Sequence, residues 1–229
     1  MSDIGLSGPG RGLFDAWSSF YDLEAVQRAT YRPVHRAVMR SLREEHAASI
    51  LDVGCGTGQL DADIVRELPW ARVVGCDFSH GMLRHAADRS DRVRWVQGDA
   101  CRLPFHDARF DAVVSTEAFH WFPDPAAALA EFHRVLVPCG RILIAHATSP
   151  AHWVEELLHA ASRLVGEPFR WPTQDEMRER VERAGFTVAS QEHIARLPGG
   201  LLFAPILTTA VKPDRHSASH ATRRPAAHA

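Results

Sequence analysis

The chain has 229 residues, enough for one domain with a single large core, and its hydrophobic (45%) and charged (24%) fractions are ordinary for a globular protein. A formal net charge of −2 gives no electrostatic reason to expect a nucleic-acid partner. There is no apolar run of the roughly 20 residues that span a bilayer, no secretory signal and no disulfide scaffold, so a cytoplasmic protein without a membrane span is expected.

The N-terminal part of the chain is expected to be helical after a short flexible segment. Residues 1–12 are rich in glycine and are expected to be flexible. Residues 13–46 have the pattern of helices, and Pro33 can start a second helix because proline is tolerated in a first turn.

Short apolar runs follow, and most of them end near Gly or Asp. They lie at 49–53, 72–76, 93–96, 111–115 and 141–145. Continuous apolar runs of about five residues, separated by helical stretches, are typical of parallel strands that are buried on both faces. The alternation therefore predicts an α/β fold.

The stretches between and after these runs carry helix start and stop signals. Ser79 can cap a helix, and Asp124 can do the same before a proline in the first turn. Thr173 and Glu176 have the spacing of a capping box, and Gly185 is a suitable stop for that helix.

Two further strands are predicted at 187–194 and 201–211, on either side of a short turn-like segment at 197–200. A short connection predicts that these two strands are antiparallel neighbours. The tail from residue 213 onward is rich in Ser, His, Ala and Arg and is expected to be disordered. The sequence thus predicts one domain at 13–212.

In open parallel sheets, ligands bind at the carboxyl ends of the strands, so these ends are where chemistry is expected. The first run leads into glycines at 54, 56 and 58, which permit a tight turn and a close approach of a ligand to the backbone. Asp77 ends the second run and can accept hydrogen bonds from both hydroxyls of a ribose. Asp99 follows the third run and can accept from an adenine amine. By themselves, the loop and Asp77 fit either NAD or S-adenosylmethionine (SAM).

Four segments together resemble the successive motifs of class I SAM-dependent methyltransferases. They are LDVGCGTG at 51–58, VVGCDFS at 73–79, VQGDACRLPF at 96–105 and the block at 110–144 that begins FDAVVSTEAFHWF. The resemblance is to the small-molecule branch grouped with the UbiE-type and type 11 enzymes, and it covers about residues 48–145. One departure is Pro138-Cys139-Gly140, where the family usually reads Pro-Gly-Gly.

This resemblance implies a fold, a cofactor and a set of site residues. The fold is Rossmann-like, a doubly wound seven-stranded sheet with an antiparallel last strand and an N-terminal helical lid. The cofactor is SAM, with the glycine loop at its methionine and ribose part, an acidic residue at its ribose hydroxyls, and the third strand's end at its adenine. The implied cofactor-binding residues are Tyr21, Asp52, Gly54, Cys55, Gly56, Gly58, Asp77, Phe78, Met82, Asp99, Ala100 and Ser115.

The implied reaction is transfer of a methyl group to a small molecule by in-line displacement, since SAM carries an activated methyl group. Ser115, Glu117 and His120 follow the fourth run, where the family's cofactor meets its substrate. His120 is the candidate base, because imidazole titrates near neutral pH; the alternative is that it only orders the loop beside Trp121. Aromatic residues Trp153, Phe169 and Trp171 favour an apolar or ring-containing acceptor, unless they belong to the core.

Three alternatives differ in their expected features. An NAD-dependent oxidoreductase would share the glycine loop and Asp77 but not Asp99 or the fourth block. A nucleic-acid methyltransferase would need a basic face. A non-catalytic SAM-binding or regulatory protein would keep the whole cofactor set and lack turnover. No metal site is expected, since the Cys and His spacings match no common zinc pattern. The sequence does not predict the acceptor or the oligomeric state.

Overall fold

The computed structural model describes residues 31–148, 172–194 and 204–214. Several of the expectations above lie outside these residues. They are the flexible segment at 1–12, the helical lid with Tyr21, the aromatic residues at 153, 169 and 171, the turn at 197–200, and the tail beyond 214.

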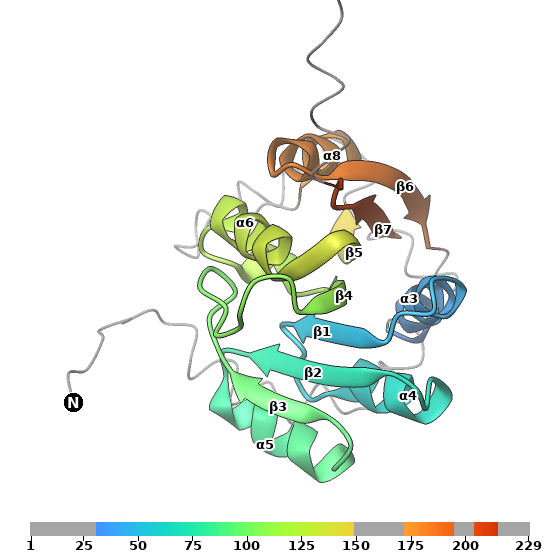
Figure 1. Ribbon diagram of the computed structural model, residues 1–229, viewed down its shortest axis with the longest axis vertical. Helices are drawn as coiled ribbons and strands as arrows, with labels where there is room; N and C mark the ends of the chain where they lie inside the picture. The colour runs from blue at the N-terminus through green and yellow to red at the C-terminus, as the bar shows by residue number, and fades with distance from the viewer. Residues whose placement is uncertain (1–30, 149–171, 195–203, 215–229) are drawn as a thin grey trace, which may run out of the picture.

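One sheet of seven strands organises the described residues, in the order β3-β2-β1-β4-β5-β7-β6 (Figure 1). Strands β1 to β5 are parallel, and β7 runs antiparallel to both β5 and β6. The strands are β1 (Ser49–Val53), β2 (Arg72–Asp77), β3 (Arg94–Gln97), β4 (Phe110–Thr116), β5 (Leu136–Thr148), β6 (Thr187–His193) and β7 (Ala204–Val211). The predicted α/β fold with an antiparallel last strand is confirmed.

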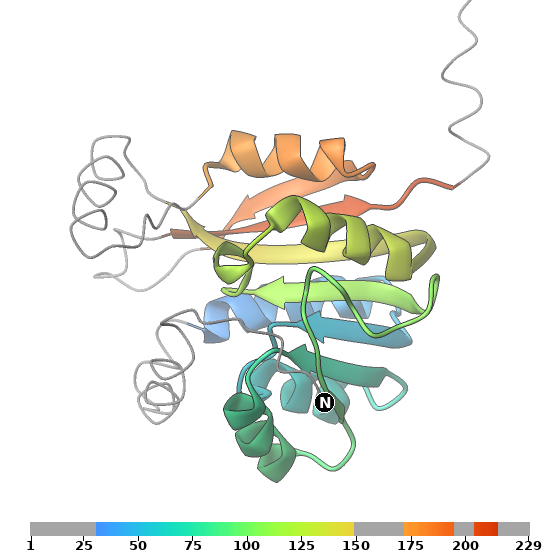
Figure 2. The same ribbon diagram turned by 90° about the vertical axis from the view of Figure 1, so that its left-hand side faces the viewer.

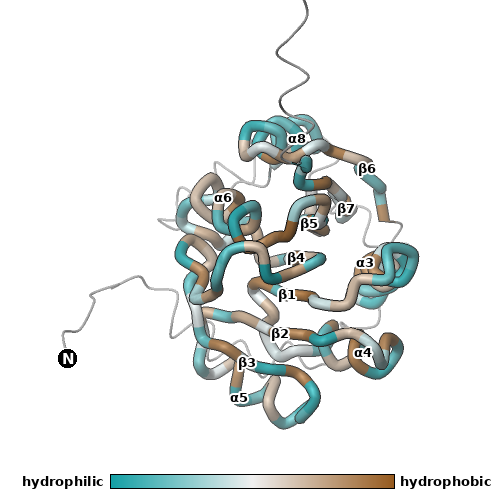
Figure 3. The backbone as a smooth tube through the Cα atoms, viewed as in Figure 1, coloured by the Kyte–Doolittle hydropathy of each residue, from teal (hydrophilic) through white to brown (hydrophobic). Residues whose placement is uncertain are grey.

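Helices cover both faces of this sheet. On one face lie α3 (Arg32–Glu44) and α4 (Gln59–Glu67), and α5 (His80–Arg89) packs against α4 and β3. On the other face lie α6 (Pro125–Val135) and α8 (Gln174–Arg183). Figure 1 shows α3 and α4 on the side of the sheet opposite α6. Figure 3 shows hydrophobic stretches in the central strands and hydrophilic stretches in the outer helices, as expected for two apolar layers.

The predicted helix caps are present. The Ser79 hydroxyl accepts a hydrogen bond from the Met82 amide at 3.2 Å, and an oxygen of Asp124 accepts from the amides of Ala126 and Ala127, both at 3.0 Å. Thr173 and Glu176 form the reciprocal bonds of a capping box. These caps satisfy amide groups that a first helical turn leaves without partners.

The sheet places the ends of four strands at a common edge. Strand β1 has β2 on one side and β4 on the other, so the order of the strands reverses at β1, and ligands of open α/β sheets bind beside such a point. Figure 2 shows the arrowheads of β1, β2 and β4 pointing toward the same edge of the molecule. The glycine loop follows β1, Asp77 ends β2, Asp99 follows β3 and His120 follows β4, so these four candidates lie at this edge.

Candidate functional site

The loop after β1 is a tight turn with three glycines in the left-handed region. The φ angles of Gly54, Gly56 and Gly58 are 78°, 55° and 73°. A Cβ at Gly54 would overlap the Ala118 side chain, and one at Gly58 would overlap Trp95, whereas a Cβ at Gly56 would meet nothing within 4 Å. The expectation that all three glycines clear space for a ligand is therefore too broad: Gly56 alone faces open space, and the other two make room for the protein itself.

Asp77, at the end of β2, holds this loop in place. One carboxylate oxygen accepts a hydrogen bond from the Gly56 amide at 2.8 Å, and the other accepts from the Ser79 amide at 2.8 Å. Burial raises the pKa of Asp77, and the amide hydrogen bonds from Ser79 and Gly56 oppose that rise. Beside it, the Phe78 ring is 45% exposed and Met82 is buried in the first turn of α5. The carboxylate has further lone pairs that can accept hydrogen bonds from a ligand.

The segment after β3 is held by helix α6, which lies on the face of the sheet opposite α4 (Figure 1). An oxygen of Asp99, which is exposed, accepts from the Cys101 amide at 2.8 Å, and Ala100 is buried. The Arg134 guanidinium on α6 donates to the carbonyls of Leu103 and Phe105 at 3.0 Å and 2.7 Å. Arg134 also pairs with Glu131, whose other oxygen accepts from the Leu103 amide. Asp99 thus stands at the start of a loop whose backbone is held by an ion pair.

Beneath the glycine loop lie two buried carboxyl groups in contact with each other. Asp52 on β1 is 1% exposed and Asp61 in the first turn of α4 is 0% exposed. Burial raises the pKa of Asp52 well above its ordinary value, and neighbouring Asp61 and Asp77 raise it further. Burial also raises the pKa of Asp61, to about 7. The thiol of Cys55, half-buried above this pair, has a raised pKa from burial and from the same carboxyl groups.

Strand β4 ends at Thr116, one residue beyond the predicted run at 111–115. Ser115 and Thr116 pair with β5, so Ser115 lies within the strand and does not follow it. The Ser115 hydroxyl is buried and donates to the Val53 carbonyl at 2.9 Å, which ties the end of β4 to the end of β1. Glu117 is the first residue after the strand, with φ at 56° and its amide bonded to the Ala145 carbonyl.

A short 3-10 helix, η1 (Phe119–Trp121), then places His120 against the end of β5. Burial lowers the pKa of His120 to about 4. Its ring lies 4.9 Å, centroid to centroid, from that of Trp121, which is 46% exposed. His120 therefore packs on Trp121 and carries an imidazole that is uncharged at pH 7. The expectation that this imidazole titrates near neutral pH is wrong, because burial disfavours its charged form.

A second histidine, His146 near the end of β5, lies close to His120. His146 is 0% exposed, and its pKa is lowered to about 4, chiefly by burial and next by the neighbouring His120. The sequence interpretation missed it because the predicted strand ended at residue 145. Pairing of His146 with Ile206 of β7 carries the strand on to Thr148. Two imidazoles that remain neutral at pH 7 thus stand together at the ends of β4 and β5.

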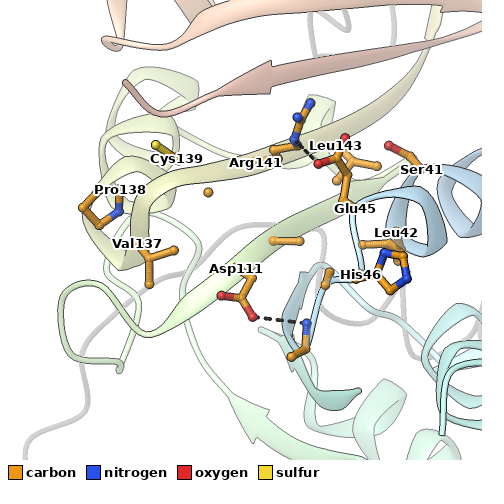
Figure 4. Close-up of a pocket in the computed structure, with 14 residues that line it drawn as sticks. Ser41, Leu42, Glu45, His46, Asp111, Val137, Pro138, Cys139, Arg141 and Leu143 are labelled. Carbon is orange, nitrogen blue, oxygen red and sulfur yellow. Dashed lines mark hydrogen bonds and ion pairs between the residues drawn. The ribbon is translucent and has the colours of Figure 1, made fainter. Parts of the chain in front are cut away.

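A shallow cleft of about 420 Å³ lies at the opposite edge of the sheet, where β1, β4 and β5 begin (Figure 4). Its charged side chains have partners within the protein. Asp111 accepts from the amides of Ala48 and Ser49, and Arg141 pairs with Glu45 at 2.9 Å. Cys139, the residue at which the sequence departs from Pro-Gly-Gly, lines this cleft and is distant from the carboxyl edge. None of the candidate cofactor residues that the structure describes lines it.

Comparison with known proteins identifies the family. The methyltransferase domain model matches residues 51–144. Demethylmenaquinone methyltransferase of Streptomyces avermitilis is 32% identical over 216 residues, which cover 83% of this chain and 90% of that one. The chain belongs to the class I SAM-dependent methyltransferases.

Two further comparisons agree with this assignment. A ubiquinone/menaquinone biosynthesis C-methyltransferase of Desulfotalea psychrophila is 36% identical over 149 residues, covering 63% of this methyltransferase and 61% of that one. A chain from the solved complex between a methyltransferase activator and a methyltransferase of Haloferax volcanii superposes with a TM-score of 0.70 at 26% identity, covering 87% of this methyltransferase and 97% of that chain. The enzyme is therefore a methyltransferase in sequence and in fold.

The described residues of the methyltransferase fit SAM. Gly56 faces open space, Asp77 keeps free lone pairs beside it, and the exposed Phe78 ring offers an apolar surface for an adenine. An orphaned oxygen of buried Asp52 also needs a cationic or donor partner. In the same residues, no group of three or more His, Cys, Asp and Glu is placed to hold a metal ion. Nor is any of their helices long and apolar enough to cross a membrane.

Proposed function

We propose that the enzyme transfers the methyl group of SAM to a ring carbon of a small hydroquinone, as in the methylation of demethylmenaquinone in its reduced form. The first support is the similarity to the demethylmenaquinone methyltransferase of Streptomyces avermitilis, which is matched over 90% of that protein's length. The second is the neutral pair of imidazoles beside an exposed tryptophan at the ends of β4 and β5. The imidazole pair carries the proposal, because methylation of a ring carbon requires removal of a proton.

In this proposal the residues at the ends of β1 to β3 hold the cofactor. Asp77 accepts hydrogen bonds from the ribose hydroxyls with the lone pairs left over from the Gly56 and Ser79 amides. Phe78 and Met82 pack on the adenine, and Asp99 with Ala100 meets its edge. Gly54, Cys55 and Gly58 shape the loop, and Ser115 joins β4 to β1 beneath it. Asp52 faces the methionine amino group. Tyr21, outside the described residues, remains a proposed contact on the resemblance alone.

The enzyme's own part in the reaction is alignment and proton removal. SAM supplies a methyl group that is already activated by the sulfonium charge. The ends of β4 and β5 orient the hydroquinone so that the nucleophilic carbon lies in line behind that methyl group. His120 accepts a proton from the acceptor in the transition state. Its imidazole is uncharged at neutral pH, and burial, which lowers its pKa to about 4, makes it a weaker base than a free imidazole, so the proton then passes on to solvent. The new carbon–carbon bond takes its electrons from the ring, the sulfur keeps the electrons of the broken bond, and the ring proton leaves to restore aromaticity.

The test is an assay with demethylmenaquinol bearing a short side chain, kept reduced with dithionite, and SAM with a labelled methyl group. We expect a product that is heavier by one CH₂ unit, with the label on the ring carbon. Replacing His120 by Ala should lower kcat on the order of a hundredfold and leave the Kd for SAM unchanged. The already methylated menaquinol is the control acceptor and should give no product.

Two outcomes would contradict the proposal. If SAM binds but the label passes to an oxygen or carboxylate acceptor and not to demethylmenaquinol, the acceptor is wrong. If SAM binds and no acceptor is methylated, the non-catalytic interpretation gains support. Titration with SAM and with NAD, on wild type and Asp77→Ala, checks the cofactor separately, because only SAM should bind and the variant should lose that binding.

A further inference from the structure

The strongest anomaly among the described residues is the pair of carboxyl groups under the glycine loop. Oδ1 of Asp52 and both carboxyl oxygens of Asp61 have no hydrogen-bond donor in the described part of the chain, although both residues are almost completely buried. Buried polar groups in folded proteins are normally paired, so an unpaired carboxyl group needs an explanation. The resemblance assigned a role to Asp52 and none to Asp61.

The titratable groups that face Asp61 come from three neighbouring elements. They are Asp52 on β1, Cys55 in the loop and Asp77 at the end of β2, and all three are acids. Two touching carboxylates in a buried site cannot both be charged at low cost, so one proton is shared between them. The pair then carries one negative charge and holds one acidic proton in the free enzyme.

A cation bound at the glycine loop changes the protonation of the carboxyl pair. SAM brings an ammonium group and a sulfonium group, and its net charge is +1 at neutral pH. Asp61 stands in the first turn of α4, where the helix dipole also favours an anion. With a cation beside Asp52 and the helix terminus beside Asp61, both carboxyl groups become ionised. The shared proton then passes to solvent.

We propose that Asp61 is a further cofactor-binding residue, which shares a proton with Asp52 in the free enzyme and releases that proton when the cationic methionine end of SAM binds. The proposal relies on SAM as the cofactor and does not depend on the acceptor. When one SAM binds, the carboxyl pair loses one proton to solvent, and no covalent bond of SAM is made or broken. The pKa of Asp61, which burial raises to about 7, agrees with release in the neutral range.

Calorimetric titration with SAM measures the released proton when it is repeated, at each pH, in two buffers that both titrate near that pH and differ in ionisation enthalpy. We expect wild type to release close to one proton per SAM near pH 6 and almost none near pH 9. The Kd should rise about five- to tenfold from pH 7 to pH 6. Asp61→Asn should release no proton and should change its Kd less than about twofold over the same range, because an amide cannot lose a proton.

The matched control is Asp63→Asn, which removes a carboxylate from the same helix. Asp63 is partly exposed and pairs with Arg66, so this variant should keep the proton release of wild type. A second readout is the melting temperature of the free protein at pH 8. Asp61→Asn should melt higher than wild type there, because it removes a buried acid that is costly to ionise and supplies a donor to Asp52.

Three results would overturn the inference. Wild type that binds SAM without proton release contradicts it directly, without touching the cofactor assignment. Equal pH dependence in wild type and Asp61→Asn would show that another group titrates. If SAM does not bind at any pH, the inference and the cofactor assignment fail together.

Discussion

The three glycines of the loop after β1 share a left-handed backbone but have different surroundings. Gly58 is packed against Trp95 and Ala86, whereas Gly56 faces open space at the edge where the cofactor is proposed to bind. In either place a side chain has to adopt a φ that L-residues rarely adopt, at a cost of about 1 kcal/mol. The two positions differ in what the added methyl group meets.

Replacing Gly58 by Ala should therefore destabilise the protein, and replacing Gly56 by Ala should mainly weaken SAM binding. For Gly58→Ala we expect a loss of about 2–4 kcal/mol in the free energy of unfolding, the sum of backbone strain and overpacking against Trp95. For Gly56→Ala we expect about 1 kcal/mol and at least a tenfold rise in the Kd for SAM. Urea unfolding and calorimetric titration of both variants would check this, and equal stability losses would contradict it.

At this scale the sequence predicts residue types better than their surroundings. The spacing of Gly54, Gly56 and Gly58 predicted the turn after β1, but which glycine faces a ligand depends on Ala118 and Trp95, which come from other elements. The same holds for Asp61. An acid in the first turn of a helix is ordinary, and only the packing of α4 against β1 places it beside Asp52.

Among the elements, α6 fixes the loop that begins at Asp99. Arg134 donates to the carbonyls of Leu103 and Phe105 and pairs with Glu131 and Asp107. These are charge-assisted hydrogen bonds from one side chain to two carbonyls of the loop backbone. The loop would lose its fixed conformation without them.

Replacing Arg134 by Met should lower the free energy of unfolding by about 2 kcal/mol, since it leaves several carbonyl and carboxylate groups without their donor. The Kd for SAM should rise several-fold as Asp99 loses its fixed position. Arg183→Met is the matched control, because Arg183 forms an exposed pair with Glu179 on α8 and should cost less than about 0.5 kcal/mol. Similar losses in the two variants would show that the Arg134 network adds nothing to the loop.

The elements themselves were predictable to different degrees. The run at 49–53 and the three caps were predicted correctly, because burial of a short strand and the needs of a first helical turn are local properties. The extent of β5 was not, since its end is set by pairing with β7 about sixty residues later in the chain. That error also hid His146, whose place beside His120 depends on the longer strand.

At the scale of the whole molecule, buried titratable groups give opposite contributions to the pH dependence of stability. Burial lowers the pKa of His35, His120 and His146 to about 4. Below pH 6.5 these imidazoles bind protons in the unfolded chain but remain neutral in the folded protein. The free energy of unfolding therefore falls as the pH drops from 6.5 toward 4. Asp61 acts in the other direction. Its pKa is raised from 3.8 to about 7 in the folded protein, so between these pH values the carboxyl group is ionised only in the unfolded chain. Its contribution therefore lowers the free energy of unfolding as the pH rises from 3.8 to about 7.

His35 allows the histidine contribution to be measured away from the candidate site. It lies on α3, is buried, and faces Asp63, which raises its pKa against the larger effect of burial. With a pKa of about 4 in the folded state and 6.5 in the unfolded state, His35 should cost the wild type about 2 kcal/mol at pH 5 relative to pH 8. His35→Gln removes the titration, so the stability difference between wild type and variant should shift by that amount between the two pH values. Urea unfolding at pH 5 and pH 8 measures the shift. If the stability difference between wild type and variant is the same at both pH values, His35 is protonated in the folded protein at pH 5. Water or Asp63 then stabilises the charged imidazole more than its burial indicates.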